Sequence, residues 1–309
     1  MSSRRGSAGL VPLQRALLIV NPASRRGDAS VRKASHAFAK LHVACDVVVS
    51  ERRGHAGEIA AAMANEYDSI FSLGGDGTAI EVIAATTPFG PPVGILPGGT
   101  GNLLARALAI PMDVSKAVRT LVSGDEAHVD LGRLADGTRF AIGVGVGIDA
   151  SMIASTSRAW KRRAGVLAYV VTGAKHAIKR PRFVAEIDVD GVVTRRQAAV
   201  VLIANFGVLL NGLITLGDGI RHDDGVLDVC LFDPISLTDA LRISRKLLFR
   251  DFSSDPAMTY LRGRHITVST DARLPVQADG ELIGFTPIIA TVEPLAARLL
   301  VPHCQINRH

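Results

Sequence analysis

The stretch SIFSLGGDGTAIEVI (residues 69–83) is the most informative part of the sequence. Its apolar first third predicts a buried strand, its glycines a turn, and its last third the start of a helix. Glycine lets the backbone approach a phosphate closely, and N–H groups at a helix start attract its charge. Thr78 adds a hydroxyl, whereas Asp76 repels an anion unless a cation intervenes, which favours a nucleotide bound with a metal. The plainer interpretation is a tight turn whose aspartate only caps the helix.

Two further loops of similar composition follow neighbouring strands. The run VGIL (93–96) leads into PGGTGN (97–102), and the strand expected at 16–20 ends in NPASRRG (21–27). The carboxyl ends of parallel strands lie at one edge of a sheet, where open α/β folds bind ligands. No Gly-Lys-Ser/Thr P-loop is present and no Gly-x-Gly-x-x-Gly opens the first helix. The common P-loop and dinucleotide interpretations therefore lose support.

The two halves of the chain differ in their hydrophobic pattern. Short apolar runs alternate with helical stretches as far as residue 123, which predicts a mostly parallel sheet covered on both faces. Alternating segments punctuated by glycine then predict antiparallel strands, at 139–147, 183–189 and 193–205. Asp190-Gly191 is suited to a tight hairpin turn.

This pattern predicts the domain organisation. An open α/β nucleotide-binding domain is expected at 15–127, followed by a β-rich antiparallel, sandwich-like domain at 128–309. The extreme C-terminus is expected to pack back on the first domain. Residues 1–14, rich in Ser, Gly and Arg, are expected to form a disordered leader.

Composition narrows the classes of function. The 309 residues are 48% hydrophobic and carry a formal charge of +6, which favours approach to phosphates or an anionic membrane. The three cysteines have no paired spacing, so neither a disulfide framework nor a zinc cluster is predicted, and a reducing cytoplasmic location fits best. No stretch has ~18 uninterrupted apolar residues. An aromatic content of 5%, without a basic stacking surface, argues against a nucleic-acid partner.

Five motifs occur in a fixed order along the chain. They are NP (21–22), GGDGT with EV (74–78 and 81–82), PGGTGN with AR (97–102 and 105–106), GVGID (145–149) and QADGE (277–281). In this order the sequence resembles the diacylglycerol kinase catalytic family, which includes bacterial lipid kinases and sphingosine kinases and is distantly related to NAD kinases. The resemblance covers nearly the whole chain. It implies an NAD kinase-like α/β domain, a β-rich second domain and an ATP site in the cleft between them.

The resemblance also implies roles for individual residues. ATP phosphates are expected to be contacted by the glycine loop and two other polar residues: Gly74, Gly75, Asp76, Gly77, Thr78, Asn21 and Thr100. Asp149 should border the lipid headgroup site, unless it only caps a following helix. Asn102 is assigned to the substrate side. Many family members carry an aspartate after this asparagine, whereas here Leu103 follows, which weakens the choice of diacylglycerol as substrate.

Asp279 is the expected general base. Phosphoryl transfer requires a group that orients or deprotonates the accepting hydroxyl, and the resemblance assigns that role to Asp279. Sequence pattern alone favours a simple hairpin turn at Asp279-Gly280, and both roles are compatible. Glu281, beside it, is assigned to nucleotide binding, with a solvent-facing role as the alternative.

Acidic and basic segments of the second half suggest further contacts. The segment DDGVLD (223–228) concentrates carboxylates, which suits a structural Mg²⁺ held by Asp223 or Asp224, two equal candidates, while a solvated turn is the alternative. The segment from Arg158 to Arg182 mixes basic residues with Trp160 and an apolar run, as interfacial elements do. The helix expected at 237–249 has a similar character, and a solvated helix with a buried apolar face is the alternative for both.

The sequence therefore predicts a lipid kinase that uses ATP and Mg²⁺. The first expected acceptor is a diacylglycerol-like lipid, and a sphingoid base or other lipid alcohol is the alternative. A soluble NAD kinase-like enzyme and a non-catalytic nucleotide- or lipid-binding regulator are the remaining hypotheses. The expected partners are a lipid substrate and, peripherally, an anionic membrane, and a homodimer is left open.

Overall fold

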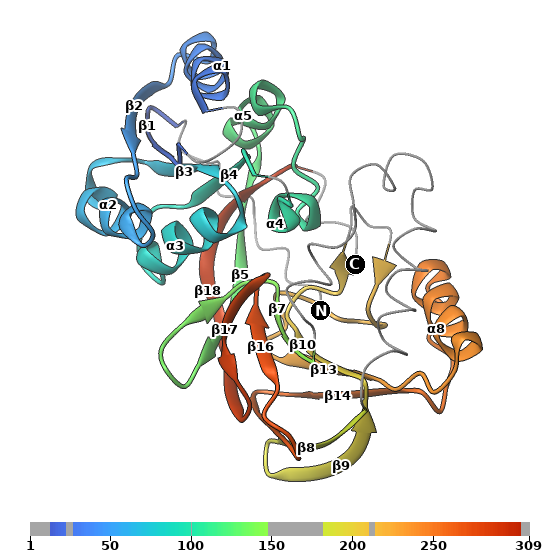
Figure 1. The fold of residues 1–309 in the computed structure, drawn as a ribbon. Coiled ribbons are helices and arrows are strands. Elements are labelled where there is room, and N and C mark those ends of the chain that lie inside the picture. Colours follow the sequence, from blue (N-terminus) through green and yellow to red (C-terminus); the bar gives the residue numbers. More distant parts are fainter. Residues whose placement is uncertain (1–12, 23–26, 100, 148–181, 210–213, 304–309) are drawn as a thin grey trace, which may run out of the picture. The chain divides into compact units, whose positions relative to one another are not determined.

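The computed structural model describes residues 13–22, 27–99, 101–147, 182–209 and 214–303. Contacts between Cα atoms divide the chain into two compact units. Unit 1 comprises residues 1–128 together with 297–309, and unit 2 comprises residues 129–296. The elements of both units are drawn in Figure 1.

Unit 1 is an α/β unit built on a parallel sheet. Its first four strands are β1 (Arg15–Val20), β2 (Ala44–Val49), β3 (Ser69–Gly74) and β4 (Val93–Pro97), in the order β2-β1-β3-β4, with β2 at the edge. Every residue of β3 and β4 is buried, as expected for parallel strands covered on both faces. The runs of Val, Ile and Leu in these strands therefore mark the core of the unit.

Helices follow each of these strands and cover both faces of the sheet. They are α1 (Gly27–Lys40), α2 (His55–Met63), the 3₁₀ turn η1 (Ala64–Glu66), α3 (Asp76–Thr86), α4 (Leu103–Ala107) and α5 (Val114–Val122). Figure 1 shows α1 and α5 on one face of the sheet and α2 and α3 on the other. Phe38 of α1 packs edge-to-face on Phe71 of β3, with ring centroids 4.8 Å apart.

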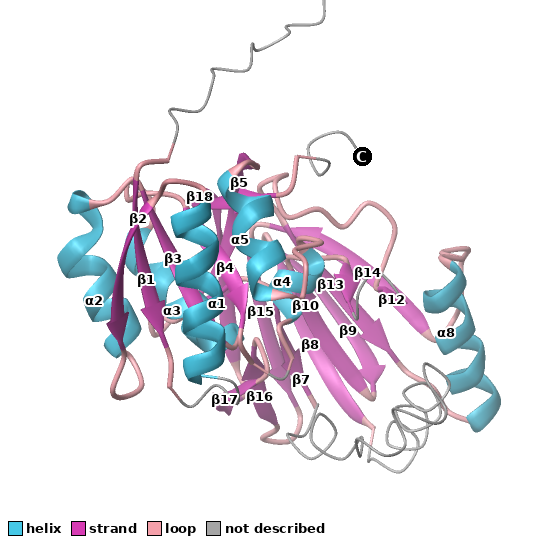
Figure 2. Ribbon diagram, turned by 90° about the horizontal axis from the view of Figure 1, so that it is seen from above, coloured by secondary structure: helices cyan, strands magenta, loops and turns pink. Residues whose placement is uncertain are grey.

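Unit 2 consists of antiparallel strands in two larger sheets and one separate pair of strands. Its strands are β6 (Arg139–Phe140), β7 (Gly143–Val146), β8 (Phe183–Val189), β9 (Val192–Ala198), β10 (Val200–Ala204), β11 (Val208–Leu209), β12 (Ile214–Thr215), β13 (Leu227–Phe232), β14 (Met258–Gly263), β15 (His265–Thr270), β16 (Pro275–Ala278) and β17 (Glu281–Phe285). One sheet has the order β14-β13-β10-β7-β16-β17, and β15, β8 and β9 belong to the other. Figure 2 shows these strands in magenta.

Strand β13 explains how unit 2 is packed. Leu227, Val229 and Leu231 point into the core between the two sheets, whereas Cys230 and Phe232 point to the opposite face. On that opposite face lies helix α8 (Leu237–Phe249), whose Ile243 packs against the same group of side chains. The period of two along the strand thus gives both of its faces an apolar layer.

Two strands pass from one unit to the other along the chain, namely β5 (Asp125–Leu134) and β18 (Ile288–Val301). The first part of β18 pairs antiparallel with β15 in unit 2, and Leu299 pairs with Val93 of β4 in unit 1. β5 pairs with β6 and β18.

The fold class predicted from the sequence is confirmed, with two local corrections. The strand expected over 139–147 is divided into β6, which pairs with β5, and β7, which belongs to the six-stranded sheet. The sequence pattern also predicted a single strand over 193–205, but this segment forms all of β9 except its first residue and all of β10, and these two strands belong to different sheets. The chain leaves one sheet and enters the other at Ala199, whose N–H donates to the carbonyl of Phe232. An uninterrupted run of strand-forming residues gives no sign of such a change of sheet.

Two Asp-Gly hairpin turns have the backbone conformation that their sequence predicted. Asp190 and Gly191 connect β8 to β9 with φ angles of 51° and 87°, and Asp279 and Gly280 connect β16 to β17 with 48° and 88°. Positive φ at both central positions is the signature of a type I′ turn.

Candidate active site

Three loops of unit 1 meet at the carboxyl edge of its sheet. After β1 the chain moves to β2 on one side, and it later returns to β3 on the other side of β1. The strand order therefore reverses between β1 and β3, and ligands of open α/β folds bind at such a reversal. Asn21 follows β1, Gly75 follows β3 and Gly98 follows β4, so all three loops lie at this edge.

A hydrogen bond joins the loops on the two sides of this reversal. The side-chain amide of Asn21 donates to Thr78 Oγ1 at 3.0 Å, and the backbone N–H of Asn21 donates to the carbonyl of Leu73, also at 3.0 Å. Thr78 is buried in the first turn of α3. Asn21 and Thr78, two of the residues expected to contact ATP phosphates, are therefore brought together.

The two glycine loops are in direct backbone contact. The N–H groups of Gly98 and Gly99 both donate to the carbonyl of Gly74, at 2.8 and 2.9 Å. A Cβ on Gly99 would come within 2.6 Å of the Gly75 Cα, a distance that real Cβ atoms do not adopt. Glycine at position 99 is thus a packing requirement of the paired loops.

Asp76 caps a helix, but not the helix that it begins. Its Oδ1 accepts the N–H of Leu104 at 2.9 Å, in the first turn of the neighbouring helix α4. The residue preceding α3 is Gly75, and no side chain accepts a hydrogen bond there as a cap. The N-terminus of α3 therefore presents its positive end beside a glycine loop, as anion-binding helices do.

Asn102 holds the second glycine loop in shape. Its Oδ1 accepts the N–H of Gly99 and its Nδ2 donates to the carbonyl of Gly99, both at 2.9 Å. It adopts a left-handed conformation with φ 48°, which asparagine tolerates better than most residues. Both ends of its amide are thus engaged within the loop.

In unit 2, Asp279 is surrounded by backbone donors. Its Oδ2 accepts the N–H of Ala141 at 2.8 Å, and its Oδ1 accepts those of Ile142 at 2.8 Å and Gly143 at 2.9 Å. Its own N–H donates to the carbonyl of Gly143. These three donors fix the position and orientation of the carboxylate. Glu281, two residues later, is exposed.

Asn205 supports this loop, and sequence reasoning did not single it out. It is fully buried, and its Nδ2 donates to the carbonyls of Ala141 at 2.8 Å and Asp130 at 2.7 Å. The segment that binds the Asp279 carboxylate is therefore fixed from behind. The only sign in the sequence is an asparagine that ends an apolar strand.

A buried carboxylate of β5, which the sequence analysis also missed, contacts the acidic segment of unit 2. Asp130 is fully buried, and it accepts the N–H of Leu295 at 2.6 Å and that of Gly225 at 2.7 Å. Burial raises the pKa of Asp130 above its ordinary value, although these N–H groups act in the opposite direction. Asp130 ties β18 to the turn that carries Asp223 and Asp224.

The two candidate metal ligands differ in their surroundings. Asp223 is held by both arms of Arg221, at 3.0 and 3.1 Å. Asp224 has a weaker contact with Arg262, at 3.9 Å, and accepts the N–H of Val226 at 3.3 Å. Within the described residues no group of three or more His, Cys, Asp or Glu side chains is arranged around a common metal position. A Mg²⁺ here would therefore use backbone carbonyls or water beside one carboxylate, and Asp224 is the better fit.

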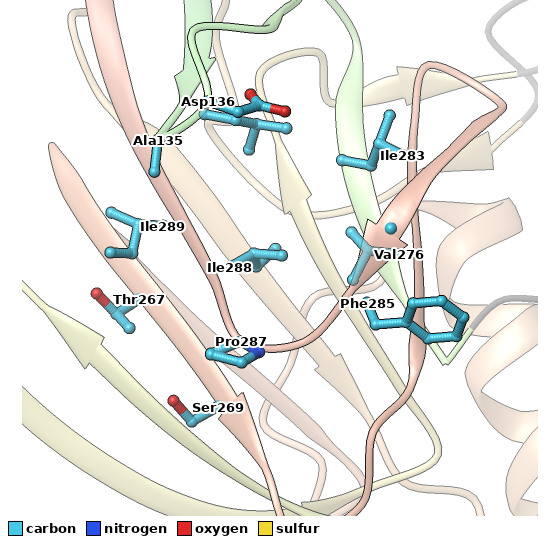
Figure 3. A pocket seen from close by; sticks show the side chains of 12 residues that line it. Ala135, Asp136, Thr267, Ser269, Val276, Ile283, Phe285, Pro287, Ile288 and Ile289 are labelled. Carbon is cyan, nitrogen blue, oxygen red and sulfur yellow. The ribbon is translucent and has the colours of Figure 1, made fainter.

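An apolar pocket opens on the hairpin that carries Asp279. It has a volume of about 420 Å³ and is lined by apolar residues from four strands, including Val276, Ile283, Phe285 and Ile288. Thr267 and Ser269 of β15 and Asp136 supply polar groups at its margin, as Figure 3 shows. Val276 lies in β16 and Asp279 in the turn that follows this strand, so the same hairpin contributes to both features.

Several expectations fall on residues that the structure does not describe. Thr100 and Asp149 lie outside the described residues, as does the segment 158–181 with its basic residues and Trp160. Among the described helices, none is long and apolar enough to cross a membrane.

Comparisons with known proteins assign both halves of the chain. Residues 15–134 match the family model described as the diacylglycerol kinase catalytic domain, and residues 142–301 match the one described as the YegS C-terminal NAD kinase beta sandwich-like domain. The α/β unit with its paired glycine loops, followed by the antiparallel sandwich, thus defines a kinase of the lipid-kinase class. The chain belongs to the diacylglycerol kinase catalytic-domain family, which confirms the resemblance found in the sequence.

Individual relatives are similar at modest identity. A diacylglycerol kinase from Staphylococcus carnosus is 26% identical, with 89% of this chain and 90% of that protein covered. An uncharacterised protein from Synechocystis sp. is 31% identical over 77% of this chain, which spans 56% of that protein. A solved diacylglycerol kinase structure from Bacillus anthracis has a TM-score of 0.73 at 20% identity, covering 94% of this chain and 98% of that one. The last similarity supports the fold alone.

Proposed function

We propose that this lipid kinase transfers the γ-phosphate of ATP to the hydroxyl group of a diacylglycerol-like lipid. The observation that carries the proposal is the pair of interlocked glycine loops at the strand-order reversal of unit 1, beside a helix N-terminus without a side-chain cap. Such an arrangement provides backbone N–H groups for phosphates. The family match supplies the class of reaction.

Unit 1 carries the proposed nucleotide site. Its phosphate-binding residues are Asn21, Gly74, Gly75, Asp76, Gly77 and Thr78, with Thr100 outside the described residues. Because Asp76 is an anion beside an anion site, it is the residue of this set suited to hold Mg²⁺ with the phosphates. The cation would neutralise charge on the transferred group. Asn102 is proposed to keep the second glycine loop, on the substrate side, in shape. Asp224 is proposed to hold a structural Mg²⁺ that keeps the acidic turn in shape.

Unit 2 carries the proposed acceptor chemistry. The acceptor oxygen forms a bond to the γ-phosphorus, the bond to the bridging oxygen of ADP breaks, and the hydroxyl proton passes to Asp279. Three backbone donors fix the orientation of the Asp279 carboxylate, as an oriented base requires. The apolar pocket on the same hairpin offers a suitable environment for the hydrocarbon part of the acceptor. Glu281 and Asp149 are proposed to lie at the margins of this acceptor site.

The names of the relatives favour diacylglycerol as acceptor, and a peripheral contact with an anionic membrane would give access to it. Leu103, in the place where many relatives carry an acid, keeps a sphingoid base or another lipid alcohol as the second candidate.

The test is transfer of labelled γ-phosphate from ATP and Mg²⁺ to diacylglycerol, sphingosine, ceramide, polyprenol and NAD. Asp279→Asn is expected to lower the rate by about 10²–10⁴-fold, whereas the loss of one backbone N–H contact should lower the melting temperature only modestly and leave the protein folded at the assay temperature. Asp190→Asn is the matched control, because Asp190 occupies the same type of turn and accepts the N–H groups of Arg264 and His265. It should retain full activity.

Each outcome is decisive for one hypothesis. A single phosphorylated lipid whose formation is lost in Asp279→Asn supports both the reaction and the base. Formation of phosphorylated NAD would show that the acceptor is a soluble nucleotide and not a lipid. Binding of ATP without transfer to any acceptor would favour a regulator.

A further inference from the structure

Helix α8 has apolar side chains on two different sides. On one side Ala240 and Ile243 are buried, and Leu247 packs partly against the six-stranded sheet. A helix on the surface of a globular unit needs only one such apolar stripe to be held in place. Any second apolar stripe on the same helix therefore has no role in this packing.

The second stripe lies on the outer side of α8 and consists of large exposed side chains. Leu237, Leu241 and Phe249 are 50%, 41% and 71% exposed, and Ile235 just before the helix is 68% exposed. Positions 237, 241, 245 and 249 are each four residues apart, so they follow one side of the helix. We call this stripe, together with Arg245 and Arg250, the α8 ridge. Figure 1 shows α8 with only one side toward the strands of unit 2.

The charges of the α8 ridge are mainly positive. The guanidinium side chain of Arg245 is 64% exposed, with only a long contact of 3.9 Å to Asp251. Arg250 makes no ion pair with the described residues. The carboxylates of this region are held by other partners, Asp239 and Asp255 by Arg242, and Asp251 by Ser253 and Lys246.

The α8 ridge is also preformed. Ser236 and Asp239 form a reciprocal capping box at the start of the helix. Arg242 donates two hydrogen bonds to the buried Asp255, at 2.8 and 3.2 Å. The exposed side chains thus stand on a helix fixed at its start and along its length, and little ordering is required when they are covered.

We propose that the α8 ridge docks this kinase on the surface of an anionic lipid bilayer. The proposal rests on the proposed function, because an enzyme whose acceptor is a lipid must meet the bilayer that contains it. Exposed Leu, Ile and Phe side chains beside arginines match the combination that such a surface binds, with apolar chains below and anionic headgroups above. The single-sided stripe with no acidic ridge residue argues against a complementary second copy, since two identical basic faces repel each other.

The experiment measures sedimentation of the full chain with vesicles of phosphatidylcholine, with and without phosphatidylglycerol, in the absence of ATP. Leu241→Ser with Phe249→Ser is expected to weaken binding by at least about tenfold. Arg245→Gln with Arg250→Gln is expected to weaken binding by ~5-fold per arginine, and only on vesicles that contain phosphatidylglycerol.

The matched control is Val192→Ser with Val193→Ser, on the β8–β9 hairpin of the same unit. These valines are exposed to a similar extent, 68% and 59%, but have no helix beside them. The control should bind vesicles as the wild type does. Unchanged melting curves for all variants confirm that the fold is retained.

A second assay separates the ridge from the proposed function. With a short-chain diacylglycerol dissolved as monomers, the ridge variants should retain the wild-type rate, because no surface is involved. If no lipid were phosphorylated, the proposed function would fail, while the vesicle assay would still decide the role of the ridge. The inference would be overturned if the ridge variants bound vesicles as the wild type does, or if they lost self-association instead of vesicle binding.

Discussion

At the scale of single residues, the chemistry of both units depends on backbone groups that bind side chains. Asp76 accepts the N–H of Leu104, Asp279 accepts three N–H groups, and Asn205 donates to two carbonyls. A backbone partner is available at almost every position of a sequence, so it leaves no signature in the residue types. The carboxylates were therefore recognised in the sequence, whereas the groups that fix them were not.

The glycines of the two loops give a residue-scale prediction. Gly99→Ala places a Cβ within 2.6 Å of the Gly75 Cα, a backbone atom that cannot give way as a flexible side chain could. We expect it to separate the loops, lower the free energy of unfolding by about 1–3 kcal/mol and abolish ATP binding. Thermal unfolding and nucleotide titration measure the two effects.

Gly75→Ala is the matched control for stability. Among the described residues its Cβ would lie 3.8 Å from its nearest neighbour, an ordinary contact. Its melting curve should therefore equal that of the wild type, while its affinity for ATP should fall if phosphate approaches the backbone there. Equal destabilisation by both alanines would contradict the packing account.

The site illustrates how far sequence reasoning reaches. Asp279 was correctly expected in a tight turn, because Asp-Gly supplies positive φ at low cost. Asp130, by contrast, lies within a strand and is far in sequence from Gly225 and Leu295, which it binds. No local pattern reveals partners that are so distant in sequence. A carboxylate inside an apolar strand is the one signal that could have found it.

At the scale of elements, the parallel strands of unit 1 were the easiest to predict. Strands buried on both faces appear as short apolar runs, and glycine or asparagine follows each at the sheet edge. The pattern failed where an element changes its environment along its length. The segment 193–205 was expected as one strand, and β5 and β18 were not recognised as strands that serve both units.

Helix α8 gives an element-scale prediction about pH. The Arg242 side chain lowers the pKa of Asp255 below its ordinary value of 3.8. A carboxyl whose pKa is lowered by folding stabilises the folded state above its unfolded pKa, and that contribution is lost as pH falls through the folded pKa. We expect Asp255→Asn to cost about 1–3 kcal/mol at pH 7.

The difference between this variant and the wild type should then narrow as the pH falls below 3.8. Urea unfolding at a series of pH values measures it. A constant difference down to the lowest pH would show that Asp255 acts through packing and not through its charge.

At the scale of the whole molecule, unit 1 is assembled from two distant parts of the chain. Leu299, Leu300 and Val301 of β18 are buried with the sheet formed by residues 15–97. Arg298 adds two hydrogen bonds to Glu126, at 2.6 and 3.0 Å, and one to the carbonyl of Gly90, at 2.9 Å. The proposed ATP-binding unit thus depends on residues that follow the whole of unit 2.

Truncation after residue 296 tests this dependence. Each buried Leu or Val contributes roughly 1.5–3 kcal/mol, so removing three of them costs a large share of the 5–15 kcal/mol typical of a native domain. We expect rapid amide hydrogen exchange throughout β1, β3 and β4 and loss of ATP binding. Exchange in β13 of unit 2 serves as the internal reference. Unchanged protection of β1 would contradict the prediction.

Because unit 1 is formed by two distant parts of the chain, its strands are synthesised at different times. On the ribosome, strands β1 to β4 emerge first, but the edge of β4 that pairs with β18 stays open until unit 2 has been made. An open strand edge invites pairing with other chains. The nascent protein therefore has an exposed edge for as long as the roughly 200 residues between Pro97 and Leu299 take to be translated, about 10–40 s at ~5–20 residues per second. Chaperone demand should depend on the length of unit 2, although the sheet at risk belongs to unit 1.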